Sequence, residues 1–168
     1  MKKFELTTNT KIVFGKKLFQ IKALVSFRNV EKGDLGGWIE KEENLSQEGN
    51  AWVYGNARVS DNAEVSGNAW VSGNAWVSGN AEVSGNARVS GNAWVYGNAD
   101  YATIKGFGTY NRNTTFFKCK DGKVRVVCGC FYGDLDEFRK QVKATRTGKV
   151  AEEYLLIADL MEKHFKED

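Results

Sequence analysis

The residues best suited to chemistry occupy one variable position of a six-residue word that repeats between Asn50 and Ile104. Tryptophan, arginine or an acidic residue stands there, after an alanine and, in all but the last word, before a valine. These residues are Trp52, Arg58, Glu64, Trp70, Trp76, Glu82, Arg88, Trp94 and Asp100. Tryptophan and arginine are enriched at the energetic centres of interfaces, and they also stack on nucleobases and hold phosphates. The repeat therefore predicts binding surfaces, which the other positions of each word must hold in place.

Those other positions indicate short strands joined by tight corners. Ala and Val lie two residues apart, so an extended segment turns both inward and turns the variable residue outward. Gly and Asn fill the corners, because Gly tolerates positive φ and Asn bonds its own backbone. Asp61 replaces one of these glycines. A fixed short period is typical of a solenoid, in which each coil packs only against its neighbours. The inward valines are Val53, Val59, Val65, Val71, Val77, Val83, Val89 and Val95, and Tyr101 takes the ninth place.

The word Val-Ser-Gly-Asn-Ala-x resembles the hexapeptide repeat of left-handed parallel β-helices. This resemblance implies an all-β solenoid with three words in each coil, so outward residues eighteen apart stack at about 4.8 Å on one face. Three faces follow. The first face carries Trp52, Trp70 and Arg88, with Tyr54 beside them. The second face carries Arg58, Trp76 and Trp94, with Tyr96, and the acidic third face carries Glu64, Glu82 and Asp100.

We interpret the first and second faces as contact surfaces. Exposed tryptophan rows leave a large apolar patch in water, and such patches usually mark binding sites. Proteins of the resembling family often form trimers around such faces, so the resemblance implies a homo-oligomer, with a trimer favoured over contact with a foreign partner. The alternative is that the rings cover the thin Ala/Val core or pack under the terminal segments. Stacked carboxylates repel, so the third face requires cations or partner groups.

The chain divides into a β-rich N-terminal cap over residues 1–49, the hexapeptide β-helix over 50–104, and a C-terminal β-hairpin with two helices over 105–168. In the cap, KFEL, KIVF and LFQIKALVSF are expected strands, separated by TTNT and GKK, and Leu45 falls in an Ala slot. The cap is expected to close the open first coil. The net charge is only +3, and there is neither a bilayer-length apolar run nor a signal peptide. These features predict a cytosolic protein that contacts no membrane.

In the C-terminal part, Asp121 and Gly122 predict a two-residue hairpin turn in which Lys120 pairs with Lys123. That register puts Thr115, Phe117, Cys119, Val124, Val126, Cys128 and Cys130 on one face. The cysteine spacing fits no usual zinc site, so core packing is favoured over metal binding or disulfides. Two helices follow, broken near Thr147 and Gly148, with Asp134 as the first N-cap. The second helix carries an apolar stripe of Val150, Tyr154, Ile157, Ala158, Met161 and Phe165.

These residues favour some classes of function over others. A non-catalytic binding protein, without cofactor or metal, is favoured. A small nucleotide held between subunits is the alternative, with bases on Trp52 and Trp70 or on Trp76 and Trp94, although the acidic face argues against extended nucleic acid. Many β-helix proteins of this kind transfer acyl groups from coenzyme A, but the single histidine, His164, lies outside the repeats, so this class is less favoured. Carbonic anhydrase chemistry would need three histidines, and ice binding would need threonine rows.

The arrangement of GDLGGWIE, tandem GNAxV words and FFKCKDG with VCGCFYG resembles uncharacterised hexapeptide-repeat proteins of phages and prophages of Gram-positive bacteria. That resemblance implies a genetic context rather than an activity. It leads to the hypothesis that the protein inhibits host machinery, such as anti-phage defence, in the bacterial cytosol.

Overall fold

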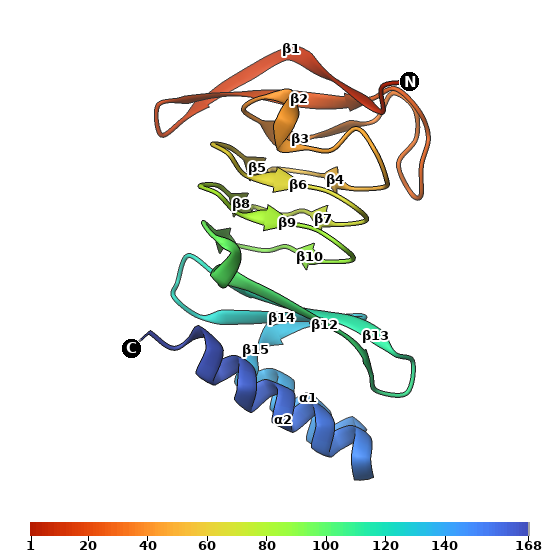
Figure 1. The fold of residues 1–168 in the computed structure, drawn as a ribbon, viewed down its shortest axis with the longest axis vertical. Helices are drawn as coiled ribbons and strands as arrows, with labels where there is room; N and C mark the ends of the chain where they lie inside the picture. The colour runs from red at the N-terminus through yellow and green to blue at the C-terminus, as the bar shows by residue number, and fades with distance from the viewer. Residues whose placement is uncertain (168) are drawn as a thin grey trace.

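The computed structural model describes residues 1–167 and arranges three parts along one long axis (Figure 1). An N-terminal sheet lies at one end, and the repeat solenoid lies in the middle. An antiparallel sheet with two helices lies at the other end. The solenoid is therefore covered at both ends, which a repeat structure needs because its terminal coils have no further neighbour.

Eight two-residue strands build about three coils of the β-solenoid. They are β4 (Trp52–Val53), β5 (Arg58–Val59), β6 (Glu64–Val65), β7 (Trp70–Val71), β8 (Trp76–Val77), β9 (Glu82–Val83), β10 (Arg88–Val89) and β11 (Trp94–Val95). Strands eighteen residues apart pair in parallel, which gives the stacked rows β4–β7–β10, β5–β8–β11 and β6–β9. Every Ala and Val of the words from Ala51 to Val95 is at most 2% exposed. The predicted solenoid and its inward positions are confirmed.

Stacked corner glycines provide a matched test of this packing. Gly73 and Gly85 have nearly the same backbone, with φ of 65° and 64°. A Cβ on Gly73 would lie 2.8 Å from the backbone N of Gly91 in the next coil, whereas a Cβ on Gly85 would meet nothing within 4 Å. Gly85→Ala should therefore cost only the left-handed strain of about 1–2 kcal/mol. Gly73→Ala adds overpacking and should cost about 2–5 kcal/mol in all, measured by urea unfolding. Equal losses would contradict the close stacking of the corners.

The N-terminal cap consists of the antiparallel strands β1 (Phe4–Val13), β2 (Lys16–Ala23) and β3 (Leu35–Ile39). Strand β3 pairs in parallel with β5, so the cap continues the sheet of β5, β8 and β11 and covers the first coil, as expected. The predicted turn at TTNT is wrong. The β-branched threonines stay extended within β1, and only the pairing register shifts there. The turn comes at Phe14 and Gly15, both with positive φ.

The coil that precedes the first full word is longer than the others. Leu45 bridges Val65, twenty residues ahead, whereas Trp52 pairs with Trp70 at the usual eighteen. Leu45 thus occupies a Val slot, and its predicted place in an Ala slot is wrong. The physical reason is that two extra residues between Leu45 and Trp52 shift the period. The short 3-10 helix η1 (Glu42–Asn44) leads into this coil.

A second 3-10 helix, η2 (Asn98–Asp100), ends the solenoid, and the C-terminal sheet and helices follow. The sheet order is β12 (Tyr101–Phe107), β13 (Arg112–Lys118), β14 (Val124–Cys128) and β15 (Phe131–Asp134), and the helices are α1 (Leu135–Thr145) and α2 (Gly148–Phe165). The predicted helix break and N-cap are confirmed, because the Asp134 side chain accepts a hydrogen bond from the Glu137 N–H at 2.9 Å. Residues 101–104, predicted as repeat, lie in β12. No helix among the described residues combines the length and apolar character needed to cross a bilayer.

The β13–β14 hairpin has a register one residue away from the prediction. Lys118 pairs with Val124, and the Cys119 N–H donates to the Lys123 carbonyl, so the loop holds three residues rather than two. Gly122 supplies the left-handed conformation at the end of this loop, with φ of 76°. A three-residue hairpin loop needs a residue in this conformation. An Asp-Gly pair is therefore compatible with a three-residue loop as well as with a two-residue turn.

The corrected register gives the C-terminal sheet two buried faces. Phe117 and Cys119 join the solenoid core and close its second end. Phe116 and Val126 pack instead with the helices. The apolar stripe of α2 packs there as predicted, with Tyr154, Ile157, Ala158, Met161 and Phe165 buried and Val150 half-buried.

The three cysteines are free thiols in different environments. Cys119 is buried, Cys128 is intermediate, and Cys130 is exposed. Core packing is therefore correct for Cys119 and wrong for Cys130, which follows the end of β14 at a turn. Burial raises the pKa of the Cys119 thiol to about 11, so that thiol stays protonated at neutral pH. Residues 1–167 contain no group of three or more His, Cys, Asp or Glu side chains arranged to hold a metal ion.

Candidate aromatic and cationic groove

The second face forms a continuous row of stacked side chains, as predicted. Arg58, Trp76 and Trp94 pair in register on β5, β8 and β11. The rings of Trp76 and Trp94 are stacked, with centroids 6.0 Å apart and an interplanar angle of 11°. The Arg58 guanidinium lies 5.1 Å from the centroid of Trp76, which is a cation–π contact. Trp38 on β3 extends the row, because it pairs with Arg58.

The N-terminal hairpin adds two further side chains to this row. Phe14 stacks on Trp76 with centroids 4.9 Å apart and an angle of 4°. The Lys11 ammonium lies 4.3 Å from the centroid of the Trp38 ring. Phe14 has a φ of 49°, which is rare for a bulky residue, and its side chain remains 74% exposed. The hairpin thus folds over the second face and holds an aromatic ring there at the expense of backbone strain.

Beside this row lies a groove with a volume of about 380 Å³. Its lining contains no carboxylate and no imidazole; it consists of Lys11, Phe14, Asn56, Arg58, Asn74, Trp76, Asn92, Ala93, Trp94 and Lys120. Lys120 is brought there by the β13–β14 loop, where its N–H donates to the Asn92 carbonyl at 3.1 Å. The groove therefore combines three cationic side chains, an aromatic stack and a row of amides.

The charge of this groove is not balanced by the protein. Within residues 1–167, none of Lys11, Arg58 and Lys120 forms an ion pair. The Nε of Arg58 is buried and has no hydrogen-bond partner. Burial lowers the pKa of Arg58, and burial together with the nearby Arg58 charge lowers the pKa of Lys11. A bound anion would offset both effects, so the groove is suited to a negatively charged ligand.

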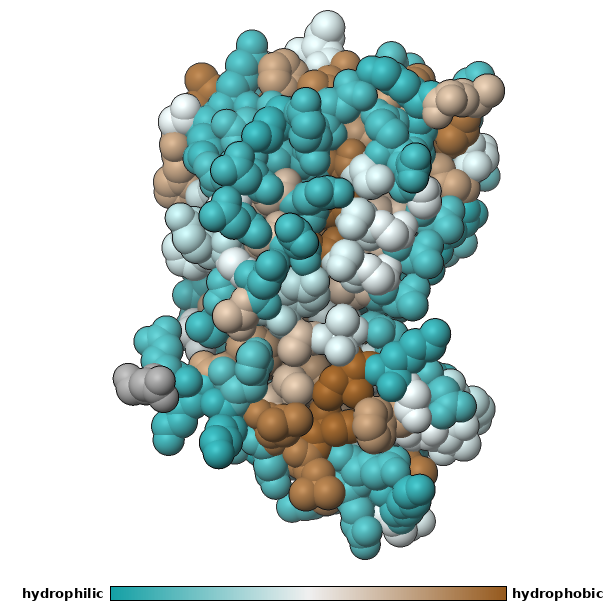
Figure 2. Space-filling view, viewed as in Figure 1, coloured by the Kyte–Doolittle hydropathy of each residue, from teal (hydrophilic) through white to brown (hydrophobic). Residues whose placement is uncertain are grey.

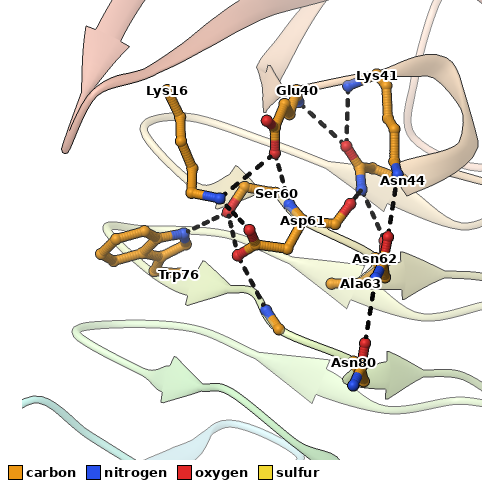
Figure 3. Close-up of polar contacts among 11 residues, drawn as sticks. Lys16, Glu40, Lys41, Asn44, Ser60, Asp61, Asn62, Ala63, Trp76 and Asn80 are labelled. Atoms are coloured by element: carbon orange, nitrogen blue, oxygen red, sulfur yellow. Dashed lines mark hydrogen bonds and ion pairs between the residues drawn. The ribbon is translucent and has the colours of Figure 1, made fainter.

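The corner beside the groove is fixed by Asp61, the residue that replaces a corner glycine (Figure 3). Its carboxylate accepts hydrogen bonds from Lys16 on β2 and from the Gly79 N–H at 3.1 Å. The Ser60 hydroxyl donates to the same carboxylate at 3.4 Å and accepts from the Trp76 indole N–H at 3.1 Å. One network therefore joins the N-terminal hairpin to the edge of Trp76. Asp61 has a φ of 59°, which aspartate tolerates better than most residue types.

This network should make stability depend on pH through Asp61. The hydrogen bond from Lys16, followed by the one from Gly79, holds the pKa of Asp61 below its usual value of about 3.9. A carboxylate with a lowered pKa stabilises the fold above the ordinary pKa, and this contribution is lost as pH falls through the lowered value. Asp61→Asn keeps a residue that tolerates positive φ but removes the charge. We expect its melting temperature to lie a few degrees below wild type at pH 7 and to approach wild type as the pH falls through the lowered pKa of Asp61. A difference that stays constant across pH would contradict this account.

The first face differs from the prediction because the N-terminal part covers it. Trp52 is 0% exposed and meets the ring of Phe27 edge-on at 5.4 Å, so it is a core residue and not a contact residue. Trp70 is half-buried beside Tyr54, and only Tyr54 and Arg88 are exposed. The alternative interpretation, that a tryptophan packs under a terminal segment, is correct for Trp52.

The third face is shorter than predicted. Glu64 and Glu82 stack and are exposed, as expected. Asp100 does not join them, because the chain turns into η2 before a further coil forms. Its carboxylate accepts hydrogen bonds from the Tyr96 and Gly97 N–H groups and pairs with Lys118 at 3.3 Å. Asp100 is therefore a capping residue at the solenoid end.

The remaining candidate residues lie outside the groove lining. Tyr96 is 68% exposed, and its ring packs over the corner at Gly79. His164 is exposed on α2 and contacts Phe165. The repeat pattern missed Lys11, Phe14, Trp38 and Lys120. Only Trp38 could have been found from the sequence, by extending the row of the second face back from Arg58. A strict period of eighteen misses it, because the interval there is twenty residues.

Comparisons with known proteins match the repeats. Residues 63–79 and 81–97 match the family described as the YdcK beta solenoid repeat. A 37-residue stretch is 51% identical to a protein named "Uncharacterized acetyltransferase YdcK" from Escherichia coli (strain K12). This match covers 22% of the present chain and only 11% of that relative. The chain thus carries YdcK-type β-solenoid repeats, and the terminal parts that complete the groove lie outside the family match.

Proposed function

We propose that this protein is a non-catalytic binding protein whose groove holds a small anionic ligand with an aromatic ring, of the nucleotide class. The observation that carries this proposal is a groove lined by three cations, Lys11, Arg58 and Lys120, which form no ion pair within residues 1–167, together with Trp94, which is 43% exposed. Clustered cations that lack carboxylate partners favour an anion. An open indole face favours a stacked ring.

The size and lining of the groove support a small ligand. A volume of about 380 Å³ lies within the range of small-molecule sites. A base or similar ring would stack on Trp94, and its phosphates would meet the cationic side chains. The amides of Asn56, Asn74 and Asn92 both donate and accept hydrogen bonds, so they suit the polar edges of a base or a sugar.

Acetyl transfer is the second candidate, and the name of the E. coli relative is the observation that favours it. Coenzyme A contains an adenine nucleotide, so it belongs to the proposed ligand class. Transfer also requires a positioned general base. The groove lining has no His, Asp or Glu, and His164 lies on α2. We therefore expect coenzyme A to bind without acetyl transfer.

The test is calorimetric titration of the purified protein with AMP, coenzyme A, adenosine and inorganic phosphate. We expect AMP and coenzyme A to bind with saturation. Adenosine lacks the phosphate that the cations would bind, and inorganic phosphate lacks the ring that would stack on Trp94, so each should bind at least about tenfold more weakly. Lys120→Gln removes an exposed cation without touching the core and should weaken AMP binding and its salt dependence. Absence of binding by both nucleotides would refute the proposal.

A protein partner on the second face is the competing proposal. The sequence resemblance to phage proteins supports a host protein as that partner. Native mass spectrometry of the protein purified from bacterial cytosol separates the two ideas. A retained mass of a few hundred daltons that disappears on denaturation supports a small ligand. A co-purifying protein that is released by substitution of Trp94 would replace the nucleotide proposal.

A further inference from the structure

The outward side of α2 carries an apolar centre that none of residues 1–167 covers. Leu156 and Leu160 are 69% and 57% exposed, although they lie in the middle of the helix. Figure 2 shows apolar side chains gathered over the part of this face where Figure 1 draws α2. The opposite side of the same helix carries Tyr154, Ile157, Ala158 and Met161, which are buried against the rest of the protein. Helix α2 is therefore apolar on two sides. One side packs in the core, and the other remains exposed to solvent.

The exposed leucines belong to a regular stripe. Lys149, Glu153, Leu156, Leu160 and Lys163 follow spacings of four, three, four and three residues along α2. Such spacings form the seam along which two helices pack in a coiled coil. A lone surface leucine needs no explanation, but two at the centre of a seam do.

The charges in the stripe select one orientation of a second helix. If two copies of α2 pack antiparallel about a point between Leu156 and Leu160, each Leu156 faces the Leu160 of the other copy. Glu153 then faces Lys163, and Lys163 faces Glu153, so both charged positions are complementary. In a parallel pair, Glu153 would face Glu153 and Lys163 would face Lys163, which is repulsive. Glu153 is already held near its position by an ion pair with Lys149 at 3.6 Å.

We propose that α2 is a homodimer interface, in which two copies of this chain pack antiparallel through Leu156 and Leu160 with Glu153 and Lys163 as reciprocal ion pairs. The arrangement is two-fold symmetric, so the same patch serves both copies and the assembly closes at two. The groove on the second face is built by other elements and remains open in each copy. Self-association then requires neither of the tryptophan faces.

Sedimentation equilibrium over a range of protein concentrations tests the proposal. We expect the average mass to rise from 18.8 kDa toward twice that value. Leu156→Glu should weaken the dimer at least about tenfold, since it buries a charge at the centre of the seam. Ile12→Glu is the matched control, because Ile12 is 76% exposed on the N-terminal hairpin and its substitution should leave the dimer unchanged. Circular dichroism should show both variants folded.

Charge exchange tests the orientation. Glu153→Lys alone should weaken the dimer, because it faces Lys163 of the other copy, and Lys163→Glu alone should do the same. The double variant Glu153→Lys/Lys163→Glu should restore it. A wild-type monomer at all concentrations would overturn the proposal, and so would a dimer that tolerates Leu156→Glu or a double variant that does not recover. A trimer would also overturn it and would return self-association to the tryptophan faces.

Discussion

Trp52→Ala is expected to lower the free energy of unfolding by about 3–5 kcal/mol, the usual loss when a buried aromatic side chain is truncated in a core. Trp52 is the largest fully buried side chain of the protein's described part. Its ring fills the space between the first coil and the N-terminal cap. A Cβ on Gly36 of β3 would lie 2.7 Å from the Trp52 ring, and the edge-on ring of Phe27 covers another side. Removal of the indole therefore leaves a cavity bounded by backbone that cannot collapse.

The measurement is urea unfolding followed by far-ultraviolet circular dichroism, with Trp94→Ala as the control. Trp94 occupies the same position of the repeated word, but it is 43% exposed. Its substitution should cost about 1–2 kcal/mol, less than that of Trp52, because its ring is only partly removed from water and no closed cavity is left behind. If both variants lost the same stability, the cap would not pack on the first coil in the way described.

The contrast between Trp52 and Trp94 shows what the sequence could predict. The period and the Ala–x–Val pattern fix which residues point inward and which share a row, because these depend only on neighbouring coils. Whether an outward residue is exposed depends on segments outside the repeat. Phe27 and Gly36 lie in a stretch with no periodic signal, and nothing local indicates that this stretch folds back over the first face.

The groove is partly predictable, because the repeat determines which side chains share a row but not which side chains the terminal segments add. Arg58, Trp76 and Trp94 were found from their spacing of eighteen residues. Lys11 and Phe14 come from a hairpin that the TTNT segment concealed, because the predicted turn was placed inside what is one continuous strand. Lys120 depends on the register of the β13–β14 hairpin. A three-residue loop and a two-residue loop both accept Asp-Gly, so the sequence left this register undetermined by one residue.

The groove residues come from all three parts of the chain, and this bears on function. The solenoid supplies the row of rings and one cation, and the two terminal parts supply the other two cations, Lys11 and Lys120. The terminal parts are therefore more than covers for the open ends of the solenoid. A protein that shares only the repeats would lack two of the three cations, so an activity named for such a relative cannot be carried over from repeat similarity alone.

Trp94→Ala should weaken nucleotide binding about 5- to 150-fold while it leaves the fold intact. Stacking of a base on an aromatic side chain contributes about 1–3 kcal/mol, and each 1.4 kcal/mol corresponds to about tenfold in Kd. The measurement is calorimetric titration of the variant with AMP.

Tyr54→Ala is the control for this experiment, since Tyr54 is 53% exposed but lies on the first face. Its substitution should leave the Kd for AMP unchanged. Trp94→Phe keeps a stacking ring and should recover most of the affinity, which distinguishes stacking from a general effect of truncation. If Trp94→Ala bound AMP as tightly as wild type, the cations of the groove would hold the phosphate alone, and the second face would recognise anions without regard to the ring they carry.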